Sequence, residues 1–328
     1  MAFCSPCGGL RLNNASAFSQ RPSCSTNAPR FSTYHGKSLL GSVSLNTSVR
    51  APSSSSARNI RSLKCVISSS ETSSKLAGTA DIDWKSLLFA YIPTRCHVKY
   101  TYSTETNTWS GPELQTESTV NLHIGATALH YGQSCFEGLK AFHCKDGKVR
   151  LFRPDENSKR LNTSAHRLCM PQVPLELFLE ATKMAVRENV MYVPPYGSGG
   201  SLYIRPLLFG SGPKIGLAPA DEYTLLVMVT PVGDYYKGGL SPVTGYICDG
   251  YDRAAPRGVG NAKVGANYAA DILPNQECKK KGFPINLYLD ALERKYVEEF
   301  GTSNFVAIKN GTYVTPDSAS VLKSITNK

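Results

Sequence analysis

The chain of 328 residues is 41% hydrophobic and 19% charged, which is typical of a globular protein with a substantial core and about two domains. The net charge of +11 would suit a nucleic-acid-binding protein, but the first acidic residue is Glu71, and eight of the 36 lysines and arginines precede it. The other 28 basic residues stand against all 25 acidic ones, so the excess belongs to the N-terminus and no nucleic-acid partner is expected. No apolar run approaches the roughly 20 residues of a membrane-spanning helix, and no membrane association is expected.

The first 70 residues have the composition of an organelle transit peptide. They are rich in serine, carry Arg and Lys but no acid, and lack the long apolar core of a secretory signal. We therefore expect residues 1–70 to be a disordered, cleaved transit peptide, processed within residues 61–70. It would direct the protein to the plastid stroma; a mitochondrial address and a simple disordered tail are the alternatives. The ten cysteines form no zinc or disulfide pattern, so no metal site is predicted.

The pattern of polar and apolar residues predicts a small α+β domain over residues 80–232. Polar and apolar residues alternate in some segments, apolar residues recur at helical spacing in others, and turn residues separate them. Within this domain, the Asp146-Gly147 pair between two apolar runs is typical of a β-hairpin. The elements expected in chain order are an entering strand over 81–93, a strand, turn and second short segment over 100–114, the hairpin over 141–152, helices over 155–168 and after Pro174, and buried strands over 201–210 and 224–232.

A glycine-rich segment, residues 233–242, is expected to connect this domain to a second one over residues 243–328. The second domain should contain a helix over residues 267–280, strands within residues 286–300, and a hairpin turning at Asn310-Gly311. It stops after about 85 residues without a terminating strand or helix. We therefore expect a truncated domain, and a chain that is poorly active and marginally folded unless a longer natural product supplies the rest.

One lysine, Lys263, lies in the apolar and small-residue run GVGNAKVGANY. Burial would depress its pKa and make its neutral amine a nucleophile toward carbonyl carbon. The alternative is an exposed lysine in a surface loop beside turn glycines. The spacing of residues around Lys263, taken alone, favours that alternative.

Five segments in order resemble the branched-chain amino acid aminotransferases, which are class IV, fold-type IV pyridoxal-phosphate enzymes. The segment GNAKVGANY resembles the lysine motif of that family, and the match extends from about residue 81 to the last residue. The other four segments are HYGQSCFEGLKAF (130–142), RLFRPDENSKRL (150–161), LYIRPLLFG (202–210) and YVEEFGTSNFV (296–306).

The resemblance implies an α+β or mixed α/β fold, with a small α+β domain and a larger, mostly β-barrel-like cofactor-binding domain. It implies transamination of L-leucine, L-isoleucine and L-valine with 2-oxoglutarate, giving the branched 2-oxo acids and L-glutamate. Lys263 would be the catalytic residue, bound to pyridoxal 5'-phosphate as a Schiff base. The family is homodimeric, with residues of one small domain approaching the active site of the other subunit.

Further roles follow from the same resemblance. Arg160 would bind the cofactor phosphate, Glu299 would face the pyridine nitrogen in preference to Glu298, and Tyr268 would hydrogen-bond the phenolic oxygen. The remaining cofactor-binding residues implied are Thr302, Leu322, Ile325 and Thr326.

Four residues would bind the substrate. Tyr131, Phe136 and Tyr203 would form an apolar pocket for the branched side chain, and plain core packing is the alternative for Tyr131 and Phe136. Arg205 would help hold the carboxylate of glutamate or 2-oxoglutarate.

The sequence departs from the family pattern near its end. Where the family has a phosphate-binding turn of the type LPGITR, this chain has VLKSITN, with Lys323 and Ser324 in place of proline and glycine. The altered turn and the short end favour a non-catalytic paralogue as an alternative. A D-amino acid aminotransferase and an aminodeoxychorismate lyase are further alternatives, and the FEGLKAF and LYIRPLLFG segments argue against both. The preferred branched chain and the direction of the reaction in the cell are left open.

Overall fold

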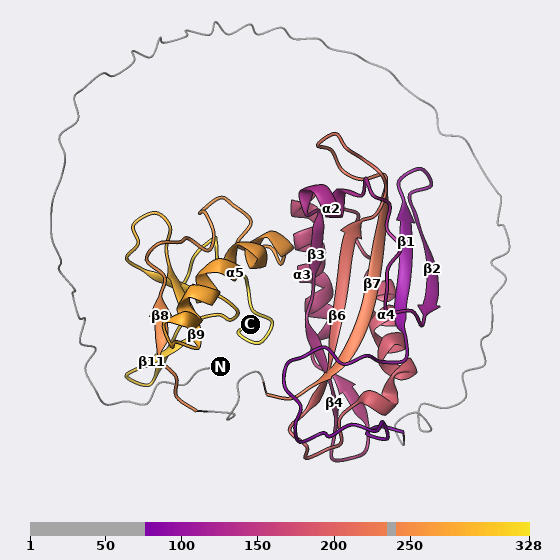
Figure 1. The fold of residues 1–328 in the computed structure, drawn as a ribbon, viewed down its shortest axis with the longest axis horizontal. Helices are drawn as coiled ribbons and strands as arrows, with labels where there is room; N and C mark the ends of the chain where they lie inside the picture. The colour runs from indigo at the N-terminus through magenta and orange to yellow at the C-terminus, as the bar shows by residue number, and fades with distance from the viewer. Residues whose placement is uncertain (1–75, 235–240) are drawn as a thin grey trace, which may run out of the picture. The chain divides into compact units, whose positions relative to one another are not determined.

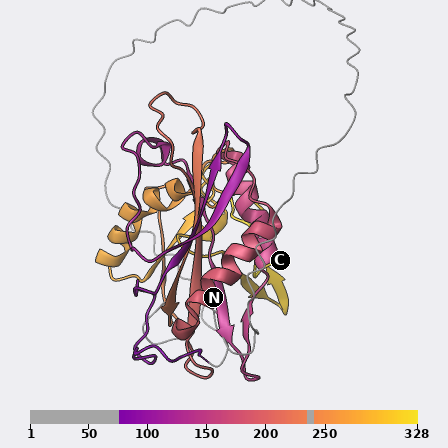
Figure 2. The same cartoon turned by 90° about the vertical axis from the view of Figure 1, so that its right-hand side faces the viewer.

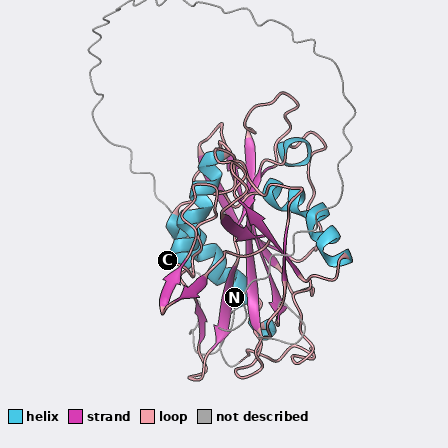
Figure 3. Ribbon diagram, turned by 90° about the vertical axis from the view of Figure 1, so that its left-hand side faces the viewer, coloured by secondary structure: helices cyan, strands magenta, loops and turns pink. Residues whose placement is uncertain are grey.

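The computed structural model describes residues 76–234 and 241–328. The expected transit peptide lies outside the described residues, as does most of the expected connection over 233–242. Figure 3 shows the described part as a mixture of helices, strands and long loops, in agreement with the mixed fold class expected from the sequence.

Seven strands from the first half of the described chain form one sheet, in the order β2-β1-β7-β6-β4-β5, with β3 paired to β6. Its centre is the long antiparallel pair β6–β7, in register from Ser201 opposite Val232 to Gly210 opposite Tyr223 (Figure 1). Both strands are rich in β-branched and leucine side chains, most of them buried, which suits a central position. The strands are β1 His97–Ser103, β2 Thr108–Gln115, β3 Ser134–Phe136, β4 Leu139–His143, β5 Val149–Leu151, β6 Ser201–Gly210 and β7 Glu222–Val232.

Two amphipathic helices, α3 (Pro154–Arg167) and α4 (Leu175–Glu188), pack against each other and contact strands of this sheet (Figure 2). Proline at the first position of α3 and acids in its first turn favour the helix start there. The buried face of α4 includes Phe178, which is fully buried. Two shorter elements complete this part: helix α2 (Thr127–Tyr131) and the 3-10 turn η1 (Val190–Tyr192).

The second part of the described chain holds a parallel crossover. Strands β8 (Gly245–Ile247) and β9 (Ile285–Leu289) are parallel neighbours, and helix α5 (Gly265–Lys280) lies between them in sequence. Parallel strands need such a connection. Strand β10 (Val297–Phe300) completes this sheet, and β11 (Ala307–Lys309) pairs with β12 (Thr312–Val314) as a separate hairpin.

Lys263 sits where the crossover approaches the large sheet. The backbone N–H of Phe136 donates to the Lys263 carbonyl at 3.0 Å, and Cys135 of β3 forms an isolated bridge with Val264. The neighbours Ala262 and Val264 belong to the same hydrophobic cluster as the core of the large sheet. The lysine backbone is therefore built into the core, two residues before helix α5 begins.

The predicted hairpins, helices and central strands are present, but the entering strand over 81–93 is wrong. That segment forms turns and only one isolated bridge, between Leu88 and Asp234. The Asp83 carboxylate accepts from the N–H of Lys85, and Ile92 N–H donates to the Thr230 hydroxyl rather than to a ladder carbonyl. A local side-chain bond such as that of Asp83 competes with strand pairing, and the bond to Thr230 takes a second backbone N–H away from it. Within the described residues, no helix combines the length and apolarity needed to cross a membrane.

Candidate active site

A cavity of about 590 Å³ brings together most of the residues singled out in the sequence, and we call it the Lys263 cavity. Nine of the twelve candidates line it: Arg160, Tyr203, Lys263, Tyr268, Glu299, Thr302, Leu322, Ile325 and Thr326. Phe136, Arg205 and Tyr131 are not among its lining residues. Most of the lining residues come from β4, α3, β6, α5, β10 and β12, from the loops before α5 and after β10, and from the last described loop.

Contacts of both its side chain and its backbone hold Lys263. Its Nζ donates to the Tyr268 hydroxyl at 2.8 Å and lies 4.7 Å from the centroid of the Phe136 ring. Its backbone N–H donates to the Ser164 hydroxyl at 2.8 Å. Asn267, one turn into α5, donates to the carbonyls of Val259 and Ala262, which ties down the loop before the lysine. The amine is thus held beside the rings of Phe136 and Tyr268.

Burial lowers the pKa of Lys263 to about 8. The Arg160 and Arg205 charges act in the same direction, and the Glu137 carboxylate opposes them. Because the ammonium form is the one that burial disfavours, the neutral nucleophilic amine becomes accessible near physiological pH.

The amine of Lys263 should therefore titrate into its reactive form about two pH units earlier than free lysine, whose pKa is about 10.4. Reductive methylation with formaldehyde, read at Lys263 by peptide mass mapping, should speed up about tenfold per pH unit below pH 8 and level off above it. N-acetyl-lysine methyl ester serves as the reference and should still be accelerating at pH 9. A Lys263 rate that keeps rising to pH 10 would contradict the lowered pKa.

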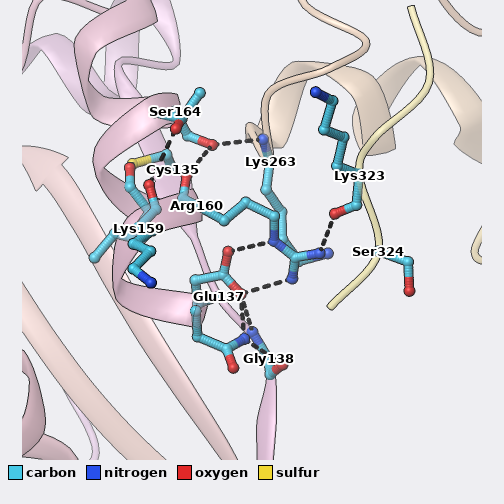
Figure 4. A network of polar contacts seen from close by, with 12 residues as sticks. Cys135, Glu137, Gly138, Lys159, Arg160, Ser164, Lys263, Lys323 and Ser324 are labelled. Atoms are coloured by element: carbon cyan, nitrogen blue, oxygen red, sulfur yellow. Dashed lines mark hydrogen bonds and ion pairs between the residues drawn. The ribbon is translucent and has the colours of Figure 1, made fainter. Parts of the chain in front are cut away.

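Arg160 lines the Lys263 cavity, and Figure 4 shows its polar contacts. Its Nε and Nη2 each donate to one carboxylate oxygen of Glu137 at 2.7 Å, and its Nη1 donates to the Lys323 carbonyl at 2.9 Å. A guanidinium carries five N–H groups, so two stay unassigned, one on each terminal nitrogen. Arg160 therefore offers a charged fork to an anion in the cavity.

Glu299 and the buried Arg253 mark a second part of the cavity. The Arg253 Nη1 lies 2.6 Å from the Glu299 Oε1 with both side chains 4% exposed, as an ion pair without a well-aligned hydrogen bond. The Leu322 N–H also donates to Glu299. Burial nevertheless raises the pKa of Glu299 to about 7 against the lowering effect of Arg253. The carboxylate is poised to ionise when a cation is brought next to it.

The neighbouring acid, Glu298, is also buried, but it faces a different group of residues. It accepts hydrogen bonds from the hydroxyls of Ser318 at 2.7 Å and Ser320 at 2.6 Å, and it lines another cavity. The register of β10 shifts between Val297 and Glu299, and such an irregularity changes how side chains alternate along a strand. Glu298 thus anchors the loop that carries Leu322 and is more than an acid on a strand edge.

Arg205 and Phe136 form a layer next to the lysine rather than part of the cavity wall. The Arg205 guanidinium donates to the Tyr203 hydroxyl at 3.0 and 3.2 Å and lies 4.5 Å from the Phe136 ring centroid. Phe136 also packs against Tyr268, with ring centroids 5.0 Å apart. Gly138 is required here, because a Cβ at that position would lie 2.4 Å from the Tyr203 hydroxyl.

Tyr131 is not brought together with the other candidate residues. It ends helix α2, is 45% exposed, and donates its hydroxyl to the Ile215 carbonyl. It lines a separate cavity of about 310 Å³ with Arg167 and Leu217. Within one chain, Tyr131 therefore forms no part of the Lys263 cavity.

The segment that departs from the family turn contacts Arg160 and lines the cavity. Lys323 contributes its backbone carbonyl to Arg160, while its exposed side chain points away (Figure 4). Arg153 donates to the Ile325 carbonyl, which ties this segment to the start of α3. Thr326 is exposed and lines the cavity. Lys323 therefore acts on Arg160 through its backbone carbonyl and not through its side-chain charge.

Sequence reasoning missed Glu137, Arg253 and Ser164. Glu137 stands inside the quoted FEGLKAF segment, where a charged residue between apolar neighbours was the available signal. Arg253 lies ten residues before the lysine and carries no local signal. It lies in a loop and forms its ion pair with Glu299, which lies on strand β10.

Comparisons with known proteins agree with this site. The family model described as Amino-transferase class IV matches residues 134–328. The chain is 46% identical over 252 residues to the branched-chain-amino-acid aminotransferase of Haemophilus influenzae, covering 75% of this chain and 73% of that protein. It is 41% identical over 268 residues to branched-chain amino acid aminotransferase 2, chloroplastic, of Humulus lupulus, covering 80% of this chain and 64% of that one.

Solved structures give the same result. The branched-chain amino acid aminotransferase of Escherichia coli matches with a TM-score of 0.58 at 26% identity, over 70% of this chain and 71% of that chain. A second crystal structure of the Escherichia coli enzyme matches with a TM-score of 0.53 at 27% identity, over 70% of each chain. With the fold, the lysine segment and these relatives in agreement, the chain belongs to the branched-chain aminotransferases of the class IV aminotransferase family.

Proposed function

We propose that this chain is a branched-chain amino acid transaminase that uses pyridoxal 5'-phosphate. It would exchange the amino group of L-leucine, L-isoleucine or L-valine with 2-oxoglutarate. The observation that carries the proposal is that one cavity holds a lysine amine of lowered pKa, a buried carboxylate and an arginine with two unassigned donors.

The chemistry of these residues fits pyridoxal phosphate. Arg160 offers its two remaining N–H groups to a phosphate, a pairing that suits a guanidinium fork. Burial raises the pKa of Glu299, and a protonated pyridine nitrogen beside it would favour the ionised carboxylate. Tyr268 would donate to the phenolic oxygen. When bound, the cofactor acts as an electron sink for the carbanion formed at the substrate α carbon.

Four further residues would complete the cofactor site. Thr302, Ile325 and Thr326 line the same cavity and are proposed as ligands near the phosphate and ring, together with Leu322. Leu322 also supports the site indirectly, because its N–H donates to Glu299.

Lys263 would have two tasks. Its Nζ would hold the cofactor covalently, and, once released by the substrate amine, it would carry the proton between the substrate α carbon and the C4′ atom of the cofactor. An amine with a pKa near 8 is suited to both, because it can accept and return a proton at neutral pH. The hydroxyl of Tyr268, 2.8 Å away, would keep Nζ aimed along that path.

The substrate would be held by the layer beside the lysine. Tyr203 lines the cavity and is proposed to contact both the α-carboxylate and the branched side chain, with Phe136 behind it. Arg205, bonded to the Tyr203 hydroxyl, is proposed to help bind the second carboxylate of glutamate or 2-oxoglutarate.

We also propose the domain division and assembly expected from the sequence: a small domain over 80–232, a connection over 233–242 and a cofactor-binding domain over 243–328, in a homodimer. The exposed position of Tyr131, outside the Lys263 cavity of its own chain, supports a role toward a second copy. A plastid location is proposed from the basic, serine-rich first 70 residues and is supported by the chloroplastic relatives.

The test is a stereospecific assay on the full chain supplied with pyridoxal phosphate. L-leucine with 2-oxoglutarate should give 4-methyl-2-oxopentanoate and glutamate, while D-leucine should give neither. Borohydride reduction followed by peptide mass mapping should place the cofactor on Lys263. Turnover of D-leucine would support a D-amino acid aminotransferase instead, and labelling at Lys263 without turnover would indicate a non-catalytic paralogue.

A further inference from the structure

A second acid in the site, Glu137, lies in a place where a carboxylate is costly. It is fully buried, in the short turn between β3 and β4, and its backbone N–H donates to the Pro206 carbonyl at 2.8 Å. A buried carboxylate is tolerated only when donors surround it. The hydrogen-bond donors around Glu137 therefore indicate its role.

The donors to Glu137 come mainly from one face of helix α3. Arg160 makes a two-pronged pair with both carboxylate oxygens, and Asn157, one turn earlier, donates to Oε2 at 2.8 Å. The N–H of Gly138 donates to the same oxygen at 3.2 Å. A two-pronged pair fixes the plane of a guanidinium as well as its position. The Lys323 carbonyl then takes one N–H of Nη1, so the unassigned pair of N–H groups has a set direction.

The same helix also holds the lysine. The Ser164 hydroxyl, one turn after Arg160, accepts from the Lys263 N–H and donates to the Arg160 carbonyl at 3.1 Å (Figure 4). Residues of helix α3 therefore position both the guanidinium of Arg160 and the residue that carries the reactive amine. Glu137 orients the side chain of Arg160, and Ser164 fixes the backbone of Lys263.

Charge gives Glu137 a second effect. The charged and titratable groups acting on Lys263 include Glu137, Arg160, Tyr203 and Arg205, and Lys263 also interacts with the Glu299 carboxylate. Among the charges, Glu137 has the largest effect: it raises the pKa of Lys263, while both arginines lower it. Its negative charge thus offsets the nearby cation of Arg160, which would otherwise face the lysine unpaired.

We propose that Glu137 is a positioning residue that aims Arg160 at a phosphate monoester in the Lys263 cavity and balances the charge of Arg160 toward Lys263. This rests on the proposed function, because pyridoxal phosphate is the phosphate monoester concerned. Glu137 itself has no part in the chemical step, since its oxygens are occupied by Arg160, Asn157 and Gly138.

The test compares Glu137→Gln with wild type in the full chain, using pyridoxal phosphate and unphosphorylated pyridoxal as probes. The amide cannot accept both prongs of Arg160, so the affinity for pyridoxal phosphate should fall about tenfold or more. The affinity for pyridoxal should change less than about threefold, because its binding does not use Arg160. Binding is followed by absorbance, independently of turnover. Glu176→Gln, the same change at an exposed residue of helix α4 outside the Lys263 cavity, should leave both affinities unchanged.

A pH profile supplies the second readout. The midpoint for labelling of Lys263 should move to lower pH in Glu137→Gln, because the carboxylate no longer offsets Arg160. If the Gln variant fails to fold, Glu137→Asp, which keeps the charge at shorter reach, should show the selective phosphate loss without the pH shift. Equal losses for both probes, or none, would overturn the proposal. A wild-type chain that binds neither probe at Lys263 would instead overturn the proposed function.

Discussion

Lys263→Ala should abolish transamination of L-leucine, lowering kcat by about 10³-fold or more. Proton transfer by a positioned base is worth about 10²–10⁴-fold, and this variant also loses the covalent attachment point. The change should not unfold the chain, because burial already disfavours the ammonium that is removed. Steady-state assays give kcat, absorbance reports the cofactor, and thermal unfolding reports the fold.

Lys159→Ala is the matched control, since this lysine lies on helix α3 with a 63% exposed side chain and pairs only with Asp155 and Glu156 among the described contacts. It should leave kcat unchanged. Borohydride labelling of another lysine in Lys263→Ala, with kcat above about a tenth of wild type, would show that the nucleophile had been misassigned.

Glu299→Gln should lower kcat by about 10²–10³-fold while the protein stays folded. A preorganised charge at the reacting system is worth about that much, and an amide cannot hold a pyridine nitrogen protonated. The effect should fall on kcat more than on cofactor affinity, because Arg160 and the rest of the cavity are untouched. The measurement is kcat for L-leucine at saturating pyridoxal phosphate.

The pH dependence of stability in the cofactor-free chain separates this effect from misfolding. The pKa of Glu299 is raised from 4.5 to about 7, so the folded state binds more protons than the unfolded state between those values. Wild-type stability should therefore fall as pH rises through that window, and this contribution should be absent in the Gln variant. The two proteins should match below pH 4.5, where the wild-type carboxyl is protonated in both the folded and the unfolded state. If kcat stayed within about threefold of wild type, the role of Glu299 would be wrong.

Much of the fold was predictable because its signals are local. Asn310 and Gly311 both adopt positive φ, at 49° and 74°, as a two-residue hairpin turn requires, and the pair Asp146-Gly147 marks the other hairpin. Helices α3 and α4 follow from side-chain spacing and from the proline that begins or precedes each. The prediction of a strand over 81–93 was wrong because hydrogen bonds of this segment go to Asp83 and to the distant Thr230. The alternation of polar and apolar residues does not reveal such partners.

The sequence by itself determined which residues are candidates for the chemistry: Lys263, Arg160, Glu299 and Tyr268 stand in motifs whose order is specific. Only the tertiary structure decided their electrostatic state. Glu137 reaches Arg160 across 23 positions, and Arg253 meets Glu299 from a separate segment. Burial and pairing together set the pKa of Lys263 near 8 and that of Glu299 near 7. Desolvation is a property of the packed interior, so no motif can specify it before the chain has folded around the group.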